Sequence, residues 1–184
     1  MRNRPIPGSS GRVRAMSLFG APVLHSPCAE VTDFGPSLAV LVEDMFATMY
    51  AANGVGLAAN QIGFPLRVFV YDCPDDDEVR HLGHIVNPVL VEADGVTVRG
   101  PEGCLSLPGL ESGTPRFDRA VVEGRTVDGD PVRVTGTGWF ARCLQHECDH
   151  LDGTVYTDRL TGLRRTRALR AARRAPWART EAGG

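Results

Sequence analysis

The chain has 184 residues, of which 42% are hydrophobic and 23% are charged, and its formal net charge is −2 at pH 7. This length suits one domain with a buried core, and no linker rich in Ser or Gly divides the sequence. The small net charge excludes a global electrostatic attraction to nucleic acid or to membranes.

The N-terminal segment 1–16 carries arginines and no acidic residue. It lacks the apolar core of a secretory signal, although its composition would also fit a transit peptide. We expect instead a disordered extension, or a start codon placed upstream of Met16. A single domain would then span 17–184 and end in a basic tail from about 164. No stretch of the sequence approaches the length of a membrane-spanning helix.

The periodicity of apolar residues predicts the regular elements. An amphipathic helix is expected over 36–52, where Leu38, Leu41 and Met45 recur at helical spacing. The turn sequence DGD at 128–130 predicts a hairpin. The other elements are expected as strands over 66–71, 85–91, 119–127 and 131–134 and as helices over 139–151 and 163–175. Strands without regular intervening helices indicate an α+β domain, with antiparallel β-sheets packed around the central helix at 139–151.

A glycine-rich segment, NGVGLAANQIG at 53–63, follows the first expected helix. It is not a phosphate-binding loop, because no Lys-Ser/Thr follows the glycines and no third glycine falls at the dinucleotide spacing. Gly54 and Gly56 would let another backbone or a ligand come close, and Gln61 offers a side-chain amide donor. A tight helix-to-strand turn is the alternative interpretation.

A second segment, GPEGCLSLPG at 100–109, holds a cysteine in an irregular backbone that glycines and prolines fix. The thiolate of Cys104 is a candidate metal ligand. The alternative is a small buried residue beside a turn, which is the commoner role of a cysteine between glycines.

A third segment, HECDH at 146–150, is the most informative part of the chain. Residues four apart share one face of a helix, so His146 and His150 would aim their imidazoles at one point. Glu147 adjoins the first histidine and could take a proton from a water held by a metal. The alternative is a polar helix face. Because apolar residues flank the motif, that alternative would bury three ionisable groups without a partner, which is costly.

A catalytic metal site usually has three protein ligands and keeps one position for water. The motif does not continue to a third histidine, because Tyr156 stands where that residue would be. Glu181 is the single acidic residue after position 158, and it lies close to a Gly-rich end. The soft ligands that remain lie upstream, where Cys104 stands out.

Together, three sequences resemble the signature motifs of the peptide deformylases: GVGLAANQ at 54–61, EGCLS at 102–106 and QHECDHL at 145–151. They follow one another in that family's order, and the resemblance spans about 18–162. It implies a hydrolase that removes the N-formyl group from the N-terminal formylmethionine of newly synthesised proteins and releases formate.

The resemblance also implies the roles of individual residues. The implied metal ligands are Cys104, His146 and His150. Glu147 would act as general base on the water and then as acid toward the leaving amine. The Gln61 side-chain amide and the Leu105 backbone N–H would stabilise the oxyanion.

The implied cofactor is one divalent metal ion, with Fe2+ as the ion in the cell and Zn2+, Ni2+ or Co2+ as substitutes. A thiolate donates more charge than an imidazole, so a Cys, His, His site makes a less electrophilic metal than three histidines. An exposed ferrous centre with a thiolate would be sensitive to oxygen.

The implied partners are N-formylmethionyl peptides and nascent chains. A peptide would bind conveniently as an extra strand, for which Val55 and Gly56 supply an open edge. Trp139 and Cys143 share a helix face with the metal site and would line a pocket for the methionine side chain. Arg142 interrupts this face. It is expected on a solvated flank, with the pocket rim or the peptide as alternative contacts.

Composition also suggests a location and a second partner. Five cysteines, an odd number, form no disulfide framework, so no disulfide partner is expected and a reducing cytoplasm is the natural location. The arginine-rich end at 164–184 could hold the enzyme weakly near ribosomal RNA. Its alternative is a solvated helix that packs Leu163 and Leu169 on the domain. No membrane partner is expected.

Two other classes of protein remain as alternatives. A metalloendopeptidase would activate water in the same way, but it would need its own third ligand and a larger domain to form a cleft. A non-catalytic protein with a structural metal site would need Cys148 as fourth ligand. A residue two positions from each histidine lies on the opposite side of the helix, which argues against that site.

Overall fold

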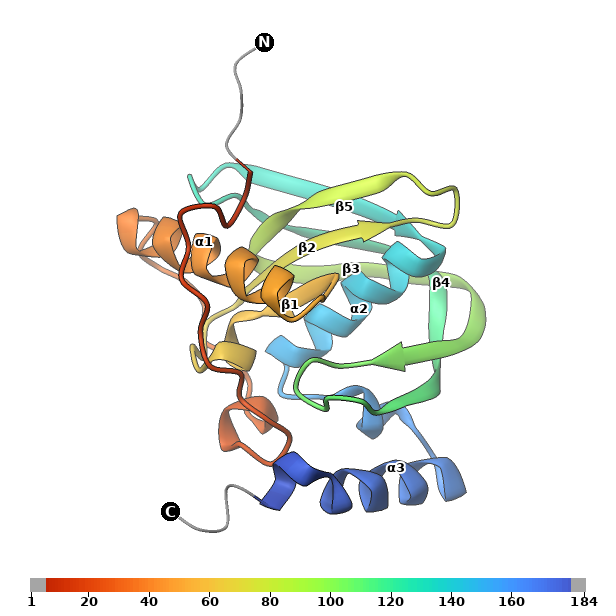
Figure 1. Cartoon of the computed structure of the whole chain (residues 1–184). Coiled ribbons are helices and arrows are strands. Elements are labelled where there is room, and N and C mark those ends of the chain that lie inside the picture. The colour runs from red at the N-terminus through yellow and green to blue at the C-terminus, as the bar shows by residue number, and fades with distance from the viewer. Residues whose placement is uncertain (1–5, 180–184) are drawn as a thin grey trace.

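The computed structural model describes residues 6–179 (Figure 1). Its helices are α1 (Pro36–Ala51), α2 (Gly138–Leu151) and α3 (Gly162–Arg174). Its strands are β1 (Gly56–Ala58), β2 (Val68–Pro74), β3 (Arg80–Gly103), β4 (Glu111–Arg125) and β5 (Pro131–Thr137). Short 3-10 turns are η1 (Pro22–His25), η2 (Ala59–Ile62), η3 (Tyr156–Arg159) and η4 (Pro176–Arg179). None of the helices in this described part is both long enough and apolar enough to cross a membrane.

The strands form one antiparallel sheet in the order β1-β2-β3-β4-β5. Within the described residues this single sheet replaces the several sheets expected from the sequence. The pairing of β3 with β4 shifts register at three places. Bulges of this kind bend a hairpin and increase its twist. In Figure 1 the half of the β3–β4 hairpin next to its connecting turn accordingly lies below α2.

The core lies on both faces of the sheet, and β2 contributes to both. Neighbouring residues of a strand point to opposite faces. Phe69 and Tyr71 therefore pack in one apolar cluster with α2, whereas Val68 and Val70 pack in another with α1. Every residue of α2 from Phe140 onward is buried. The expected α+β class is confirmed, with α2 as the central helix.

Most of the expected elements occur in the structure. The helix expected over 36–52 is α1, the helix over 139–151 is α2, and the hairpin at 128–130 joins β4 to β5. The strand expected over 85–91 is only a part of the first half of β3, which runs for 24 residues. The ends of β3 are largely exposed and carry charged residues and glycines, so no regular apolar alternation marks them.

The two arginine-rich ends differ from expectation. In the leader, defined here as residues 6–18, residues 8–14 make hydrogen bonds to Glu43, Asp44 and Thr48 of α1. The expected disorder therefore does not describe this part of the chain. Residues 1–5 and 180–184 lie outside the described residues. In the basic tail, Leu163 is 74% exposed, so the expected packing of this side chain is wrong, whereas Leu169 is half-buried.

Candidate metal centre

The two histidines of α2 point at one spot. His146 and His150 are one turn apart, and their Nε2 atoms lie 3.1 Å from each other. The Sγ atom of Cys104 lies 3.2 Å from Nε2 of His150. The three possible ligand atoms all fall within 4.8 Å of one another. The structure therefore brings together the three residues that the sequence predicts as metal ligands.

Cys104 reaches this spot because it follows the last residue of β3, in the turn that leads to β4. The backbone N–H of Ser106 and the side-chain amide of Gln61 both donate to its sulfur, each at 3.4 Å. A cysteine binds metal through its thiolate. One thiolate and two imidazoles make a donor set that fits a divalent transition metal ion.

The two imidazoles differ in their surroundings. Burial opposes protonation of His146, but its contacts with Cys104 and Glu102 outweigh burial and raise the pKa of this ring well above its ordinary value. Nδ1 of His146 lies 2.8 Å from Oε1 of Glu102, and a carboxylate on Nδ1 leaves Nε2 available as a ligand. Burial lowers the pKa of His150 well below its ordinary value, which keeps this ring neutral, as a ligand must be. The side-chain amide of Asn60 donates to the His150 carbonyl at 2.6 Å and so ties η2 to the end of α2.

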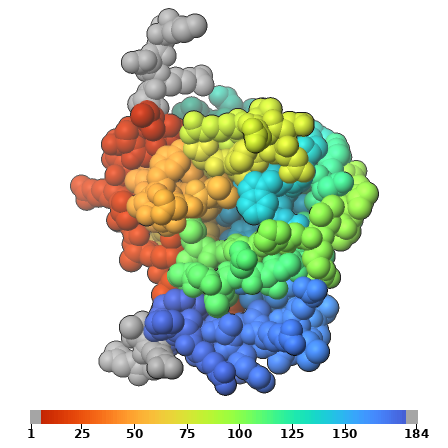
Figure 2. Space-filling model, turned by 45° about the vertical axis from the view of Figure 1, so that its right-hand side comes forward, coloured from red at the N-terminus to blue at the C-terminus, as the bar shows by residue number. Residues whose placement is uncertain are grey.

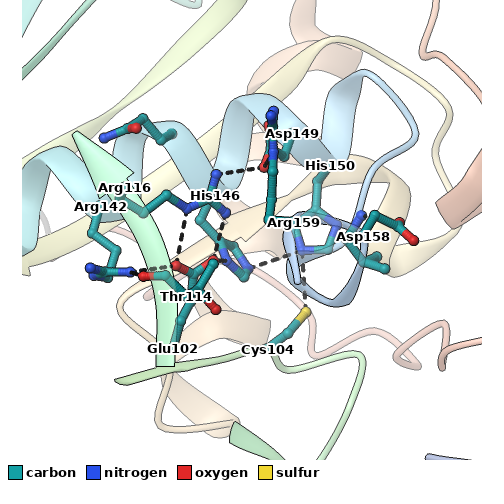
Figure 3. A network of polar contacts seen from close by, with 12 residues as sticks. Glu102, Cys104, Thr114, Arg116, Arg142, His146, Asp149, His150, Asp158 and Arg159 are labelled. Carbon is teal, nitrogen blue, oxygen red and sulfur yellow. Dashed lines mark hydrogen bonds and ion pairs between the residues drawn. The ribbon is translucent and has the colours of Figure 1, made fainter. Parts of the chain in front are cut away.

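Glu102 is the centre of a buried polar network (Figure 3). Its carboxylate accepts hydrogen bonds from Arg116 at 3.0 and 2.6 Å and from Arg142 at 2.9 Å. Burial opposes its ionisation, but the hydrogen bonds with His146 and Arg116 outweigh burial and hold the pKa of Glu102 well below its ordinary value. A negative charge is therefore fixed against the imidazole of His146.

The network continues along α2 to Asp149. Arg116 donates to this carboxylate at 2.6 Å, and Arg159 of η3 pairs with it as well. The sequence alone does not predict these partners. Asp149 lies inside the histidine motif, and a buried charge needs a partner. That rule indicates that a cation is nearby, but no local pattern says which arginine supplies it.

Arg142 is 7% exposed and lines the pocket beside the histidines. Besides its bond to Glu102, its guanidinium donates to the carbonyls of Thr114 at 2.8 Å and Val98 at 2.9 Å. The expected solvated flank is therefore wrong. Acceptors from both strands of the β3–β4 hairpin compensate the cost of burying this charge.

Glu147 is buried beside the candidate metal centre, and its Oε2 atom has no hydrogen-bond partner among the described residues. Burial raises the pKa of this carboxyl to about 7, which is suitable for proton transfer near neutral pH. Gly56 of β1 leaves the space that the carboxylate occupies, because a Cβ atom at that position would overlap it. A poised carboxylate without a protein partner is what a general base requires.

Two possible hydrogen-bond donors lie next to Cys104. The Gln61 Oε1 atom accepts from the Ala58 N–H at 2.9 Å, which turns the amide nitrogen toward Ser106 Oγ, at 3.1 Å, and toward the cysteine. The backbone N–H of Leu105 makes no hydrogen bond within the described residues. The Leu105 N–H is thus placed to donate to a ligand, whereas the Gln61 amide nitrogen, which also lines the pocket, donates to Ser106 and Cys104.

A pocket of about 890 Å³ opens onto these side chains. Figure 2 shows it as a hollow between the orange surface around β1, the cyan start of α2 and the green loop after β3. The residues of its wall that the sequence predicts are Val55, Gly56, Gln61, Cys104, Leu105, Trp139, Cys143, His146 and Glu147. Met16 and Leu18 of the leader also line it, and no sequence pattern marks either of them.

Cys148 does not belong to this group. It packs in an apolar cluster with Phe69 and Leu151 and is not among the residues that line the pocket. The structural metal site considered as an alternative would need this sulfur as fourth ligand. Its position in the core argues against that site, as helical spacing predicts.

Comparison with known proteins gives the same picture along nearly the whole chain. Residues 13–166 match the family model of the polypeptide deformylases. Peptide deformylase 2 of Streptomyces avermitilis is 75% identical over 182 residues, which cover 99% of this chain and 98% of that one. Peptide deformylase 2 of Streptomyces coelicolor is 70% identical, with 97% and 100% covered.

Solved structures agree in fold. The peptide deformylase of Thermus thermophilus has a TM-score of 0.82 and 41% identity, and the alignment covers 92% of this chain and 98% of that one. The peptide deformylase of Ehrlichia chaffeensis in complex with actinonin has a TM-score of 0.81 and 35% identity, with 88% and 96% covered.

Proposed function

The chain belongs to the peptide deformylase family, and we propose that the pocket around Cys104, His146 and His150 is its active site. The protein is a metal-dependent hydrolase that removes the N-formyl group from the N-terminal formylmethionine of newly synthesised proteins and releases formate. One observation carries the assignment of the site: three soft ligand atoms converge beside a buried carboxylate that has no protein partner among the described residues.

Cys104, His146 and His150 would hold the metal, with Fe2+ as the ion in the cell and Zn2+, Ni2+ or Co2+ as substitutes. When bound, the ion supplies Lewis acidity to the attacking water and the formyl oxygen. The mixed thiolate and imidazole donors support this assignment, because they suit late first-row divalent ions better than Mg2+ or Ca2+.

Glu147 transfers a proton from the attacking water to the leaving nitrogen. The carboxylate takes a proton from the attacking water as the new C–O bond forms at the formyl carbon. It then delivers this proton to the methionine nitrogen as the C–N bond breaks, so formate and a free amino terminus result. The pKa of about 7 supports both steps, because the same group must accept and donate near neutral pH.

Gln61 and Leu105 would stabilise the oxyanion that develops on the formyl oxygen. An amide N–H2 fixed by the Ala58 N–H and a backbone N–H without a protein acceptor among the described residues support this role. Donors held in place before the reaction cost no reorganisation when the charge develops.

The peptide would bind along β1, with Val55 and Gly56 as its contacts. β1 is the edge strand of the sheet, so its outer backbone groups are available to an added strand. Trp139 and Cys143 line the same pocket and would contact the methionine side chain.

The test is formate release from formyl-Met-Ala beside cleavage of an internal peptide, with metal analysis of protein purified without oxygen. We expect formate from the first substrate, no cleavage of the second, and about one metal ion per chain. Cys104→Ser should lose the metal on dialysis and Cys148→Ser should keep it. Loss of metal from Cys148→Ser alone, or cleavage of the internal peptide, would contradict the assignment.

The division of the chain and its location follow as further parts of the proposal. The catalytic domain would span 17–184, with residues 8–14 packed against its helix α1. The reducing cytoplasm suits a thiolate ligand and free cysteines. The basic tail from about 164 would give weak association with ribosomal RNA. The exposed arginines of α3 support this association through phosphate contacts.

A further inference from the structure

Asp44 of α1 is a buried carboxylate that the proposed reaction does not use. Its side chain is 2% exposed, and it lies on the helix that packs on the other face of the sheet from α2. A charge in such a place needs strong partners. The leader supplies them: the Arg12 backbone N–H donates to Asp44 Oδ1 at 2.6 Å, and Arg14 Nε donates to Oδ2 at 2.7 Å.

The leader is fitted closely to α1 around this contact. The Gly8 N–H donates to Glu43 Oε2 at 3.0 Å, and the Arg14 N–H donates to Thr48 Oγ1 at 2.9 Å. A Cβ atom at Gly11 would overlap the backbone carbonyl of Glu43. Only a residue without a side chain lets the two backbones come so close.

From this anchor the chain runs directly to the pocket. The Ser17 N–H donates to the Gln61 carbonyl at 2.7 Å, and the Phe19 N–H donates to the Ser106 carbonyl at 2.8 Å. These bonds hold the segment against the two residues whose N–H groups donate to the Cys104 sulfur. Met16 and Leu18, on either side of Ser17, line the pocket.

We propose that residues 8–18 form a strap whose Met16 and Leu18 side chains complete the substrate pocket and contact the apolar part of the bound peptide. Asp44 is then a positioning residue, because it fixes Arg14 two residues before Met16. This inference rests on the proposed function. It adds a wall to the pocket that comes from outside the signature motifs.

The first test is Met16→Ala with formyl-Met-Ala-Ser as substrate and formate release as the readout. We expect KM to rise about three- to tenfold, with the effect on KM rather than on kcat. The expected rise in KM is modest because the Met16 side chain is only half-buried. Met16→Leu should restore KM, since it keeps an apolar side chain of similar size. Val13→Ala is the matched control, because Val13 lies in the same strap but is 64% exposed and does not line the pocket.

The second test is Asp44→Asn, alone and combined with Met16→Ala. If Asp44 acts through Met16, each single variant raises KM, and the double variant raises it no further than the stronger single one. A protease specific for arginine should also cut Asp44→Asn faster than the wild type at Arg12 or Arg14, whereas Glu30→Gln, an exposed carboxylate, should not change the rate.

The outcomes separate this inference from the proposed function. A wild-type protein that releases no formate contradicts the function itself. If the wild type is active and the KM of Met16→Ala lies within about twofold of the wild-type KM, the proposed role of the strap is overturned. Independent, multiplying effects of the two substitutions would overturn the positioning role of Asp44.

Discussion

At the scale of single residues, the site depends on side chains whose charge is set by burial and by partners distant in sequence. Glu147 and Glu102 are both buried carboxylates, yet burial raises the pKa of the first to about 7, whereas hydrogen bonds hold the pKa of the second well below its ordinary value. The difference follows from the hydrogen bonds that Glu102 makes with His146 and Arg116, whereas Glu147 Oε2 has no hydrogen-bond partner among the described residues. One carboxyl can therefore exchange a proton while the other stays charged and orients His146.

The first residue-scale prediction concerns Glu147→Gln. The substitution keeps size and hydrogen bonding but removes the base, so kcat should fall about 10²- to 10⁴-fold while the metal stays bound. Formate release and metal content of the same preparation provide the measurement. Activity within about tenfold of the wild type would exclude the role proposed for this residue.

The second concerns Glu102→Gln. It removes the counter-charge of two buried arginines, so we expect the free energy of unfolding to fall by about 3–5 kcal/mol. It also removes the partner of His146, so metal affinity should fall about 10- to 100-fold. Denaturant titration and competition with a chelator measure the two effects. Glu92→Gln is the control, because this exposed carboxylate of β3 pairs with Arg119 and Arg133 at the surface. Surface pairs contribute about 1 kcal/mol or less. Equal effects of the two substitutions would contradict the prediction.

At the scale of elements, α2 supplies two ligands and the base, but the strands and turns around it complete the site. β1 is only three residues long, yet it brings Gly56 against the Glu147 carboxylate and places an edge beside the pocket. The end of β3 delivers Glu102 and leads into Cys104, and η2 delivers Gln61. The site thus depends on the pairing of β1 with β2 as much as on the helix.

The element-scale prediction is Gly56→Ala. The added methyl group would overlap the Glu147 carboxylate and push it away from its position. A misplacement of about 1 Å can cost about 100-fold in rate, so we expect kcat to fall by at least tenfold with the fold intact. Gly113→Ala in β4 is the control, because a Cβ atom there meets neighbours only at ordinary contact distance. Unchanged turnover by Gly56→Ala would mean that the carboxylate has room to move.

At the scale of the whole molecule, the described segments near both chain ends, 8–18 and 162–179, are part of the structure around the pocket. Ala172 of α3 is buried in a cluster with Leu107 and Tyr156, and the Trp177 indole donates to the Pro108 carbonyl at 3.1 Å. Pro108 lines the pocket. Deleting 164–184 would therefore disturb the pocket as well as remove charge. A test of ribosome association has to change charge alone.

The whole-molecule prediction uses Arg170→Gln with Arg174→Gln, both exposed on α3. If the tail contacts ribosomal RNA, cosedimentation with ribosomes at low salt should weaken, and its dependence on salt should become less steep. Turnover of formyl-Met-Ala should not change. Arg99→Gln with Arg125→Gln removes the same charge from the sheet and should leave cosedimentation as in the wild type. Equal sedimentation of the wild type and both double variants at low salt would contradict the association of the basic tail with ribosomal RNA.

The sequence by itself determined the chemistry of this protein. The spacing of His146 and His150 depends only on the pitch of a helix, and the three motifs indicate the family because their order and composition are specific. Local periodicity likewise predicted α1 and α2, and the turn sequence at 128–130 predicted the β4–β5 hairpin. Only the tertiary structure decided how Arg116 and Arg142 pair with Glu102, that β3 and β4 extend and bend below α2, and that the leader lies on Asp44 and reaches the pocket. The physical reason is that these contacts join segments far apart in the chain. A buried charge requires a partner, but no local pattern specifies which distant residue the fold will bring to it.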